Sequence, residues 1–335
     1  MRSVLYRRHG EPSQVLETVH VDAPIEPAKG EVLIRVTHRP VHYGDLLGIA
    51  GRYRTGGDLS VPEVGNRVGF EGFGHVEQAG EGVDLAPGVR VAFFPGRAAW
   101  SERALVPADF VTAIPDAISD ETAAQLHVNP LTAALLRRAV IRAGVQPDTD
   151  TVVLTAAGSA VAKLAVAALH QAGIHAVGVV RSETGARDLS ALLPDLPLIA
   201  TDSDGWQARL IEATGDRPIK AVLDPVGGTL ASQLVGLMAN GGLLISYGDL
   251  SGEPIAVRAL AFSTRNITIF GVTVGSWAGL PAEQRVDDLR LALHLAQDHP
   301  ALFPVAARYD LADARQAAAH VDQPGKAGVV LLTSL

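Results

Sequence analysis

The stretch that decides the fold is Thr151-Val-Val-Leu-Thr-Ala-Ala-Gly-Ser-Ala-Val-Ala162. Its first four residues form an apolar run typical of a buried strand, and small residues lead from there into an apolar helical pattern at 159–171. A strand that enters a tight turn and then a helix points backbone N–H groups and the positive end of the helix at an anion. The stretch therefore predicts a phosphate-binding turn.

The residues that follow this turn alternate between strand and helix patterns. We predict strands at 175–180, 198–200, 219–223, 242–247 and 267–274, and helices at 206–213, 229–239 and 282–297. Such alternation is typical of an α/β fold with a doubly wound parallel sheet of the Rossmann type.

The residues before the turn have a different character. Up to about residue 114, Gly and Pro divide the chain into short β-rich pieces, which predict a mostly antiparallel β domain. Ser119 is a candidate N-cap for the helices that follow, and the tail from Pro304 returns to short strand-like pieces. We therefore expect a mostly β domain of residues 1–122 and 285–335, and a Rossmann-type domain of residues 123–284.

Composition limits the chemistry. The 335 residues include no cysteine, which excludes disulfides, thiol catalysis and cysteine-ligated zinc. The net charge of -8 disfavours nucleic acid as a partner. The longest apolar region, 151–180, is interrupted by Lys163 and three other polar residues, so we predict no membrane segment. With no targeting signal readable, we expect a cytoplasmic protein.

The cofactor preference rests on the end of the second strand of this sheet. The usual three glycines of a dinucleotide turn fall on Ala157, Ser159 and Ala162, so the motif alone is weak. Where an NAD enzyme is expected to place Asp or Glu, this chain has Arg181 and then Ser182, which suit a 2′-phosphate and favour NADPH. Two alternatives stay open: Glu183 is the ribose ligand, or Arg181 is merely solvated.

Taken together, the chain resembles the zinc-independent branch of the medium-chain dehydrogenase/reductase superfamily, namely the quinone oxidoreductases and 2-enoyl thioester reductases. The resemblance covers nearly the whole chain. It rests on Val41-His-Tyr-Gly-Asp45, Gly51-Arg-Tyr53, the glycine spacing of 62–80, Pro87-Gly-Val-Arg-Val91, Asn129-Pro-Leu-Thr-Ala133, Asp224-Pro-Val-Gly-Gly228 and Gly325-Lys326.

The resemblance implies a GroES-like catalytic domain and NADPH-dependent transfer of hydride to an activated C=C bond of a 2-enoyl thioester or an enone. It places the catalytic Tyr, as proton donor, on Tyr53; a loop tyrosine that only hydrogen-bonds to a neighbour or orders the substrate is the alternative. Tyr43 is a second phenol where the family more often has Asn or Pro, so the choice of acid between the two stays open. The zinc motif of related alcohol dehydrogenases is replaced by Gly69-Phe-Glu-Gly72, and His38, His42, His75 and His127 lack ligand-like spacing, so we expect no metal.

The resemblance also implies the residues that contact the cofactor and the assembly. The expected cofactor contacts are Asn129, Gly158, Ser159, Ala160, Val161, Arg181, Ser182, Tyr247, Gly248, Phe270, Gly271 and Lys326. Asn129 would serve equally well as a helix N-cap. We expect a homodimer, because relatives commonly pair the edge strands of their cofactor sheets and residues 267–274 are apolar on both faces.

Two other functions stay open. An NADPH:quinone reductase would use the same cofactor but needs no specific Tyr, and a crystallin-like protein would bind NADPH without turnover. The arginines of the first domain form a further candidate feature, because they could hold an anionic handle such as a coenzyme A phosphate; an ordinary solvated surface is the alternative. These arginines are Arg52, Arg54, Arg67, Arg97 and Arg103.

Overall fold

The computed structural model describes residues 1–24, 26–53, 60–323 and 325–334. Its contacts divide the chain into two compact units. The N-terminal unit comprises Met1–Val128 together with Ala296–Leu335, and the central unit comprises Asn129–Leu295. Within the described ranges, no helix combines the length and the apolar character needed to cross a membrane.

The central unit contains one six-stranded parallel sheet. Its strand order is β11-β10-β9-β12-β13-β14, with every neighbouring pair parallel, as the alternating pattern predicted. The strands are β9 (Thr151–Leu154), β10 (His175–Val180), β11 (Leu198–Ala200), β12 (Ile219–Asp224), β13 (Leu243–Ser246) and β14 (Thr268–Gly271). The order doubles back at β9, which is the arrangement of a doubly wound fold.

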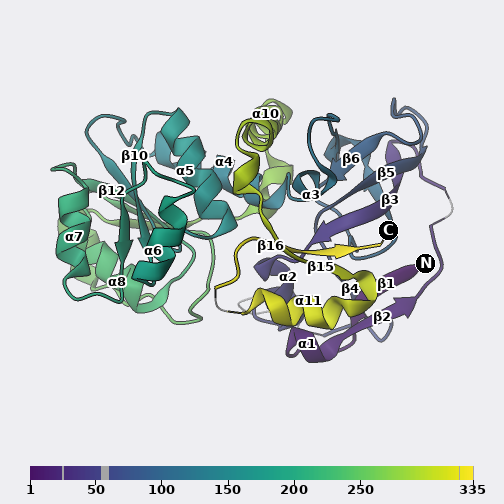
Figure 1. The fold of residues 1–335 in the computed structure, drawn as a ribbon, viewed down its shortest axis with the longest axis horizontal. Coiled ribbons are helices and arrows are strands. Elements are labelled where there is room, and N and C mark those ends of the chain that lie inside the picture. The colour runs from purple at the N-terminus through teal and green to yellow at the C-terminus, as the bar shows by residue number, and fades with distance from the viewer. Residues whose placement is uncertain (25, 54–59, 324, 335) are drawn as a thin grey trace. The chain divides into compact units, whose positions relative to one another are not determined.

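Helices cover both faces of this sheet, as Figure 1 shows, with α7 and α8 on one side and α5 and α6 on the other. The helices of the unit are α4 (Val128–Arg142, whose first residue belongs to the N-terminal unit), α5 (Ala160–Gln171), α6 (Glu183–Ser190), α7 (Trp206–Ala213), α8 (Gly228–Leu237), α9 (Ala259–Arg265) and α10 (Ala282–Asp298, whose last three residues belong to the N-terminal unit). Trp206 and Leu210 of α7 and Leu234 of α8 pack on Val177 and Val222 of the strands. Both faces of the strands are therefore buried, which explains their continuous apolar runs.

The N-terminal unit contains two sheets. The larger has the order β15-β16-β3-β5-β6-β8, with β7 paired to β3, and the smaller has the order β2-β1-β4. The strands are β1 (Arg2–Tyr6), β2 (Leu16–His20), β3 (Glu31–Pro40), β4 (Asn66–Arg67), β5 (Gly72–Ala79), β6 (Arg90–Phe93), β7 (Arg103–Pro107), β8 (Val111–Ala113), β15 (Val305–Asp310) and β16 (Val329–Thr333). All pairs except β15 with β16 are antiparallel.

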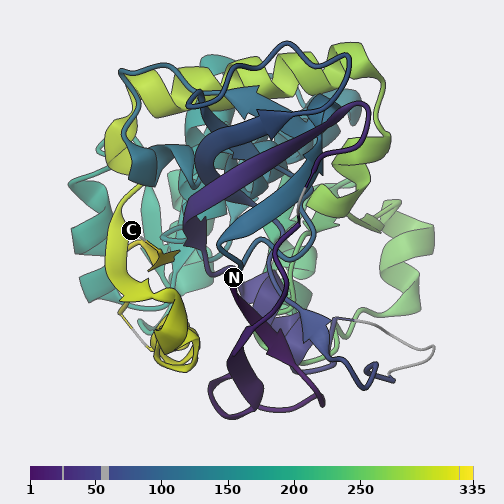
Figure 2. The same ribbon diagram turned by 90° about the vertical axis from the view of Figure 1, so that its right-hand side faces the viewer.

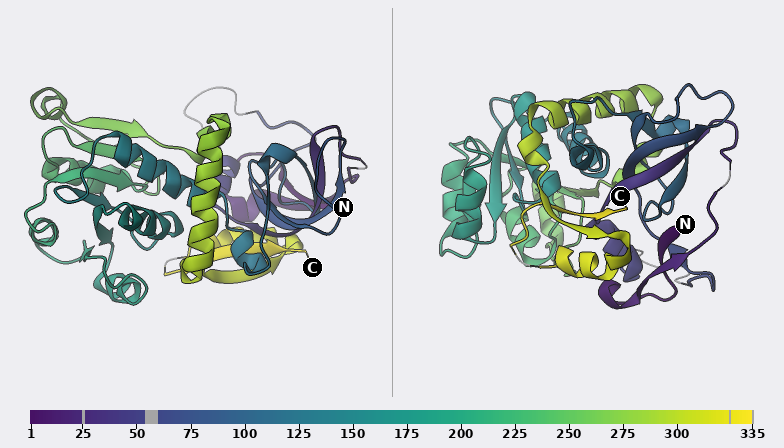
Figure 3. Two further views of the ribbon diagram at one scale, coloured as in Figure 1. Left: turned by 90° about the horizontal axis from the view of Figure 1, so that it is seen from above. Right: turned by 45° about the vertical axis from the view of Figure 1, so that its right-hand side comes forward.

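The end of the chain returns to the N-terminal unit, where β16 pairs with β3. The short helices of this unit are α1 (Pro12–Val15), α2 (Tyr43–Ile49), α3 (Asp120–Ala123) and α11 (Ala314–Val321). Figures 2 and 3 show α11, in yellow, beside the purple N-terminal segments, and both pack into one core. The expectation of a tail made only of strand-like pieces is wrong, because Ala314, Ala317 and Ala318 form a buried helical face.

Candidate functional site

The carboxyl ends of the parallel strands form one edge of the central sheet. Leu154 of β9 pairs with Leu223 of β12. Asp224, the residue after Leu223, pairs with Ser246 of β13. Ser246 in turn pairs with Gly271 of β14. The residues that follow these strands therefore lie along one edge, where open α/β sheets bind ligands.

The turn after β9 has the backbone of an anion site. Ala156 adopts a left-handed φ of 46°, which an L-residue with a side chain rarely takes, and such strain is concentrated at ligand sites. Ser159 is the N-cap of α5, and its hydroxyl accepts a hydrogen bond from the Ala162 N–H at 3.2 Å. The start of this twelve-residue helix thus leaves the first-turn N–H groups of Ala160 and Val161 available to an acceptor from outside the helix, and Gly158 directly precedes the N-cap.

The turn lacks the usual glycines, and a glycine on the neighbouring strand makes room for the larger residue. Ala157 is fully buried, and its N–H donates to the Val179 carbonyl of β10 at 3.1 Å. A Cβ on Gly178 of β10 would lie only 2.8 Å from the Ala157 Cβ, so the strand provides the space that the turn does not. The weak motif therefore still forms a closely packed strand-turn-helix unit.

Asp224 ties this turn to the next one. Its buried carboxylate accepts a short hydrogen bond from the Thr155 hydroxyl and further bonds from the N–H groups of Val226, at 3.3 Å, and Gly227, at 2.7 Å. Burial raises the pKa of Asp224, and these three donors oppose the shift. Gly227 and Gly228 both have positive φ, of 76° and 59°, so these glycines are required by the turn itself.

The end of β10 places the expected residues where the sequence predicted. The strand ends at Val180, Arg181 follows with an exposed side chain, and Ser182 is the N-cap of α6. The Ser182 hydroxyl accepts from the Gly185 N–H at 3.2 Å, which leaves its own proton to donate. The Glu183 carboxylate is instead engaged by the Ser203 hydroxyl at 2.9 Å and lies 3.7 Å from Arg209.

Tyr247 provides the test of whether this edge fits a dinucleotide. Its buried hydroxyl lies beside Ser159 but has no well-formed hydrogen bond within the described ranges, and burial raises its pKa. A buried hydroxyl without a partner is uncommon, and a ligand at the start of α5 would complete it. Gly248 packs against Pro225, while Phe270 and Gly271 end β14, so these predicted contacts also lie on the carboxyl edge. The residues present therefore fit a bound dinucleotide.

Tyr53, the predicted proton donor, belongs to the N-terminal unit. It follows α2, and 54% of its surface is exposed. A Cβ on Gly44 would lie 3.6 Å from the ring of Tyr53 and 3.8 Å from the ring of Phe70, so the two rings flank the start of α2. Tyr43, the second phenol, is the half-buried first residue of α2. Both phenols thus stand near the same helix.

A buried charged cluster lies under this helix. The Nε2 atom of His42 is 2.6 Å from Oε1 of Glu71, whose other oxygen accepts from the N–H groups of His127, at 3.1 Å, and Val128, at 2.8 Å. Burial lowers the pKa of His42, but the charge and hydrogen bond of Glu71 outweigh it, so the pKa is raised. Asp45 accepts from the His42 N–H at 3.0 Å, and burial raises its pKa to about 7.

His127 should make the protein less stable in acid. Burial lowers its pKa to about 4, from 6.5, and the Glu71 charge only partly opposes this shift. The folded state keeps His127 neutral while the unfolded state takes up a proton, so stability is complete above pH 6.5 and is lost as the pH falls toward 4. The expected loss is up to about 3 kcal/mol. Urea unfolding of the protein and of His127→Gln, compared at pH 7 and pH 4.5, measures it; an equal pH dependence in both proteins would contradict the assignment.

Two of the predicted cofactor contacts, Asn129 and Lys326, do not follow a strand of the parallel sheet. Asn129 is the buried second residue of α4, so it is not the N-cap that the sequence also allowed. Lys326 belongs to the N-terminal unit, and its ammonium donates to the Gly328 carbonyl at 2.9 Å. Burial lowers the pKa of Lys326, with Asp322 opposing the shift. Contacts of Asn129 and Lys326 with a cofactor stay predictions.

The polar groups that organise the site were harder to predict from the sequence. Neither Asp224 nor Glu71 was predicted to act as a multiple acceptor, although each is an acid within an apolar stretch, which is the available signal. In the parts of the chain that the structure describes, no three His, Asp or Glu side chains are arranged to hold a metal ion.

Comparisons with known proteins agree with this architecture. Residues 28–116 match the model of the alcohol dehydrogenase GroES-like domain, and residues 160–291 match that of the zinc-binding dehydrogenases. The mitochondrial enoyl-[acyl-carrier-protein] reductase of Caenorhabditis elegans is 28% identical over 304 residues, which cover 88% of this chain and 84% of that protein.

Solved structures share the whole fold. A Bacillus thuringiensis protein, provisionally called an NADPH:quinone reductase, is 27% identical with a TM-score of 0.85 over 100% of this chain and 99% of its own. The Escherichia coli quinone oxidoreductase, solved with NADPH, is 23% identical with a TM-score of 0.85, and both chains are covered completely. The two family models, the enoyl reductase relative and the Bacillus thuringiensis structure together support the medium-chain dehydrogenase/reductase superfamily, in the branch of the enoyl reductases and quinone oxidoreductases.

Proposed function

We propose that the protein is an NADPH-dependent oxidoreductase that acts without zinc and transfers a hydride to the activated C=C bond of a 2-enoyl thioester or an enone. The observation that carries the proposal is the end of β10, where an exposed Arg181 and the Ser182 hydroxyl meet the edge of the sheet. A cation and a hydroxyl donor suit a 2′-phosphate. The name of the Caenorhabditis elegans relative supports the enoyl substrate.

Some of these residues would bind the cofactor, and another would donate the proton. The amides of Gly158, Ala160 and Val161 and the hydroxyl of Tyr247 would hold the cofactor, which supplies the hydride when bound. The substrate carbonyl takes up the charge as an enolate, which then needs a proton. Tyr53 would provide it, because a phenolic O–H is a proton donor that carries no charge.

The test is cofactor selectivity. Replacing Arg181 with Ala should lower the preference for NADPH over NADH by about tenfold or more, because it removes a charge-assisted hydrogen bond to the phosphate worth about 1.5–3 kcal/mol. Fluorescence titration of both cofactors measures this. Arg187→Ala is the matched control, since Arg187 is an exposed arginine of α6. Equal binding of the two cofactors by the unaltered protein would overturn the proposal.

A second function is favoured by the Bacillus thuringiensis structure, whose provisional name is NADPH:quinone reductase. A quinone accepts hydride without a dedicated acid, so this function would use the same cofactor edge and make no demand on Tyr53. The phenol of Tyr53 supports the enoyl proposal more directly, and its replacement separates the two.

The assembly and location of the protein also stay proposals. The partners we propose are a small-molecule substrate and a second copy of the chain, in the cytoplasm. The edge position of β14 supports the dimer, as do Leu260 and Phe262 on α9, which are 57% and 42% exposed. The mass of the protein in solution would test it.

A further inference from the structure

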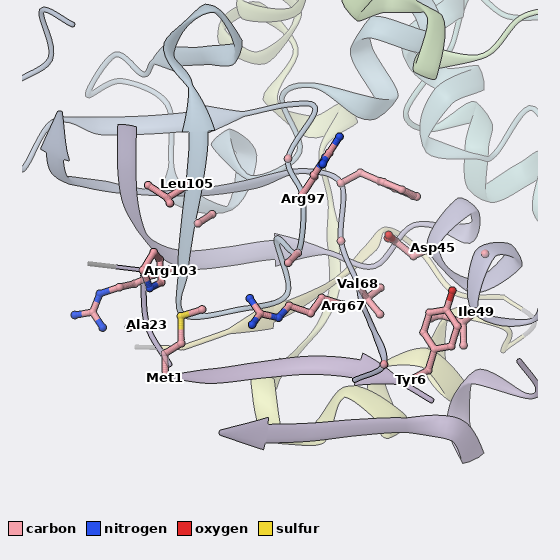
Figure 4. A pocket seen from close by; sticks show the side chains of 18 of the residues that line it. Met1, Tyr6, Ala23, Asp45, Ile49, Arg67, Val68, Arg97, Arg103 and Leu105 are labelled. Atoms are coloured by element: carbon pink, nitrogen blue, oxygen red, sulfur yellow. The ribbon is translucent and has the colours of Figure 1, made fainter. Parts of the chain in front are cut away.

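The N-terminal unit contains a cavity of 970 Å³ that lies wholly within that unit. Figure 4 shows Tyr6, Ile49 and Asp45 at one end, and Met1, Ala23 and Arg103 at the other. Its volume is in the range of small-molecule sites, about 300–1,000 Å³. Tyr53 does not line it, and none of the cofactor residues predicted above does so.

The cavity combines an apolar wall with a free cation. Tyr6, Ile49 and Val68 supply buried apolar surface. Arg67, from β4, reaches along the cavity, is exposed, and pairs with no carboxylate in the described part of the chain. An arginine without an acidic partner, beside buried apolar side chains, is suited to a carboxylate or a phosphate.

The other arginines of the cavity are placed differently. The Nε atom of Arg103 is 2.6 Å from Oε2 of Glu77, so its charge is already paired. Figure 4 shows the tip of Arg97 pointing away from that of Arg67, so the two do not converge on one anion. Among the described residues that line this cavity, Arg67 is therefore the arginine that we expect to bind an anion.

The acidic groups of the cavity fix the orientation of a ligand. Asp45 is 2% exposed at the apolar end, and one of its oxygens has no hydrogen-bond partner in the described ranges. An anionic headgroup would be repelled from that end whenever Asp45 is ionised, and drawn to Arg67 instead. Asp22 also lines the cavity, so loss of Arg67 would leave an acid that repels the headgroup.

We propose that this cavity binds an amphipathic anion, an apolar chain with a carboxylate or phosphate headgroup, with the headgroup on Arg67 and the chain along Tyr6, Ile49 and Val68. The site is independent of the proposed hydride transfer, because it needs neither the cofactor nor turnover. Carboxylate and phosphate headgroups share the required chemistry, and the choice of probes distinguishes them.

The experiment is calorimetric titration of the whole protein, without cofactor, with decanoate, decyl phosphate and decanol. At least one of the two anions should bind about tenfold more tightly than decanol, and the tighter anion names the headgroup. Arg67→Gln should remove this preference. Arg97→Gln is the matched control, because it removes an equal charge from the same cavity lining and should keep the preference.

Three results would overturn the proposal: no binding of any probe, equal binding of all three, or equal losses in Arg67→Gln and Arg97→Gln. Arg67 is exposed, so its replacement by Gln should leave the fold intact, which thermal unfolding checks. Failure of NADPH binding would leave this result unaffected, so the two proposals are tested separately.

Discussion

Replacing Tyr53 with Phe should lower the rate of enone or enoyl thioester reduction about a hundredfold at pH 7. General acid catalysis contributes about 10²–10⁴-fold, and Phe keeps the ring while it removes the proton. Because the side chain is 54% exposed, the variant should unfold at the same urea concentration as the unaltered protein. Stopped-flow oxidation of NADPH by a small enone measures the hydride step.

Tyr43→Phe is the matched control for this experiment, because Tyr43, the first residue of α2, is the other phenol in this region. Loss of rate only in the Tyr43 variant would move the acid to that residue. Reduction of a quinone at an unchanged rate by both variants, with little activity toward enones, would favour the quinone reductase. Tight binding of NADPH with no turnover of any acceptor would favour a protein that only binds the cofactor.

Replacing Glu71 with Ala should cost about 3–5 kcal/mol of unfolding free energy, because it removes one partner of a buried ion pair. Glu71 is 1% exposed, and its loss would leave the His42 imidazole and the N–H groups of His127 and Val128 without their acceptor. Two of these donors lie at the start of α4, where no intrahelical acceptor replaces them. Urea unfolding at constant m-value measures the change.

Glu71→Gln provides the comparison, because its amide oxygen can still accept from the two backbone groups. It should lose less than Glu71→Ala, and its loss should depend on pH. Glu71 raises the pKa of His42, so the stability from their charge interaction is present below pH 6.5 and is lost as the pH rises through the higher folded pKa. A loss below about 1 kcal/mol for Glu71→Ala would show that the pair is not a structural anchor.

The order and bounds of the strands and helices could be predicted where the apolar residues recur with a clear strand or helix period. The strand 175–180 and the helix 206–213 have the predicted bounds, because a buried apolar strand or an amphipathic helix limits the alternatives. The strand predicted at 267–274 covers only Thr268–Gly271, since a 3-10 helix begins at Val274. The α11 helix escaped notice because its buried face consists of alanines, which give little hydrophobic contrast.

The candidate site was predictable where it depends on local order and not where it depends on contacts. Arg181 follows a strand whose end is readable, so its position could be expected. The partners of Glu71 come from residues 42, 127 and 128, and periodicity carries no information about contacts between such distant positions. The buried Tyr247 hydroxyl without a well-formed hydrogen bond, and the cavity beside Arg67, are likewise properties of the folded chain that no local pattern of residues reveals. Of the five arginines that the sequence suggested as an anion site, Arg54 lies outside the described residues.

The contact of Ala157 with Gly178 changes what a dinucleotide-binding motif should be taken to mean. The requirement is a distance between a turn and the adjacent strand, and either partner can be the small one. The two positions therefore behave as a single volume shared by residues 21 places apart, and a larger side chain at one position must be matched by a smaller one at the other. A pattern written for the turn alone records only half of that constraint, so chains of this kind would be passed over by it while keeping the geometry that it was written to find.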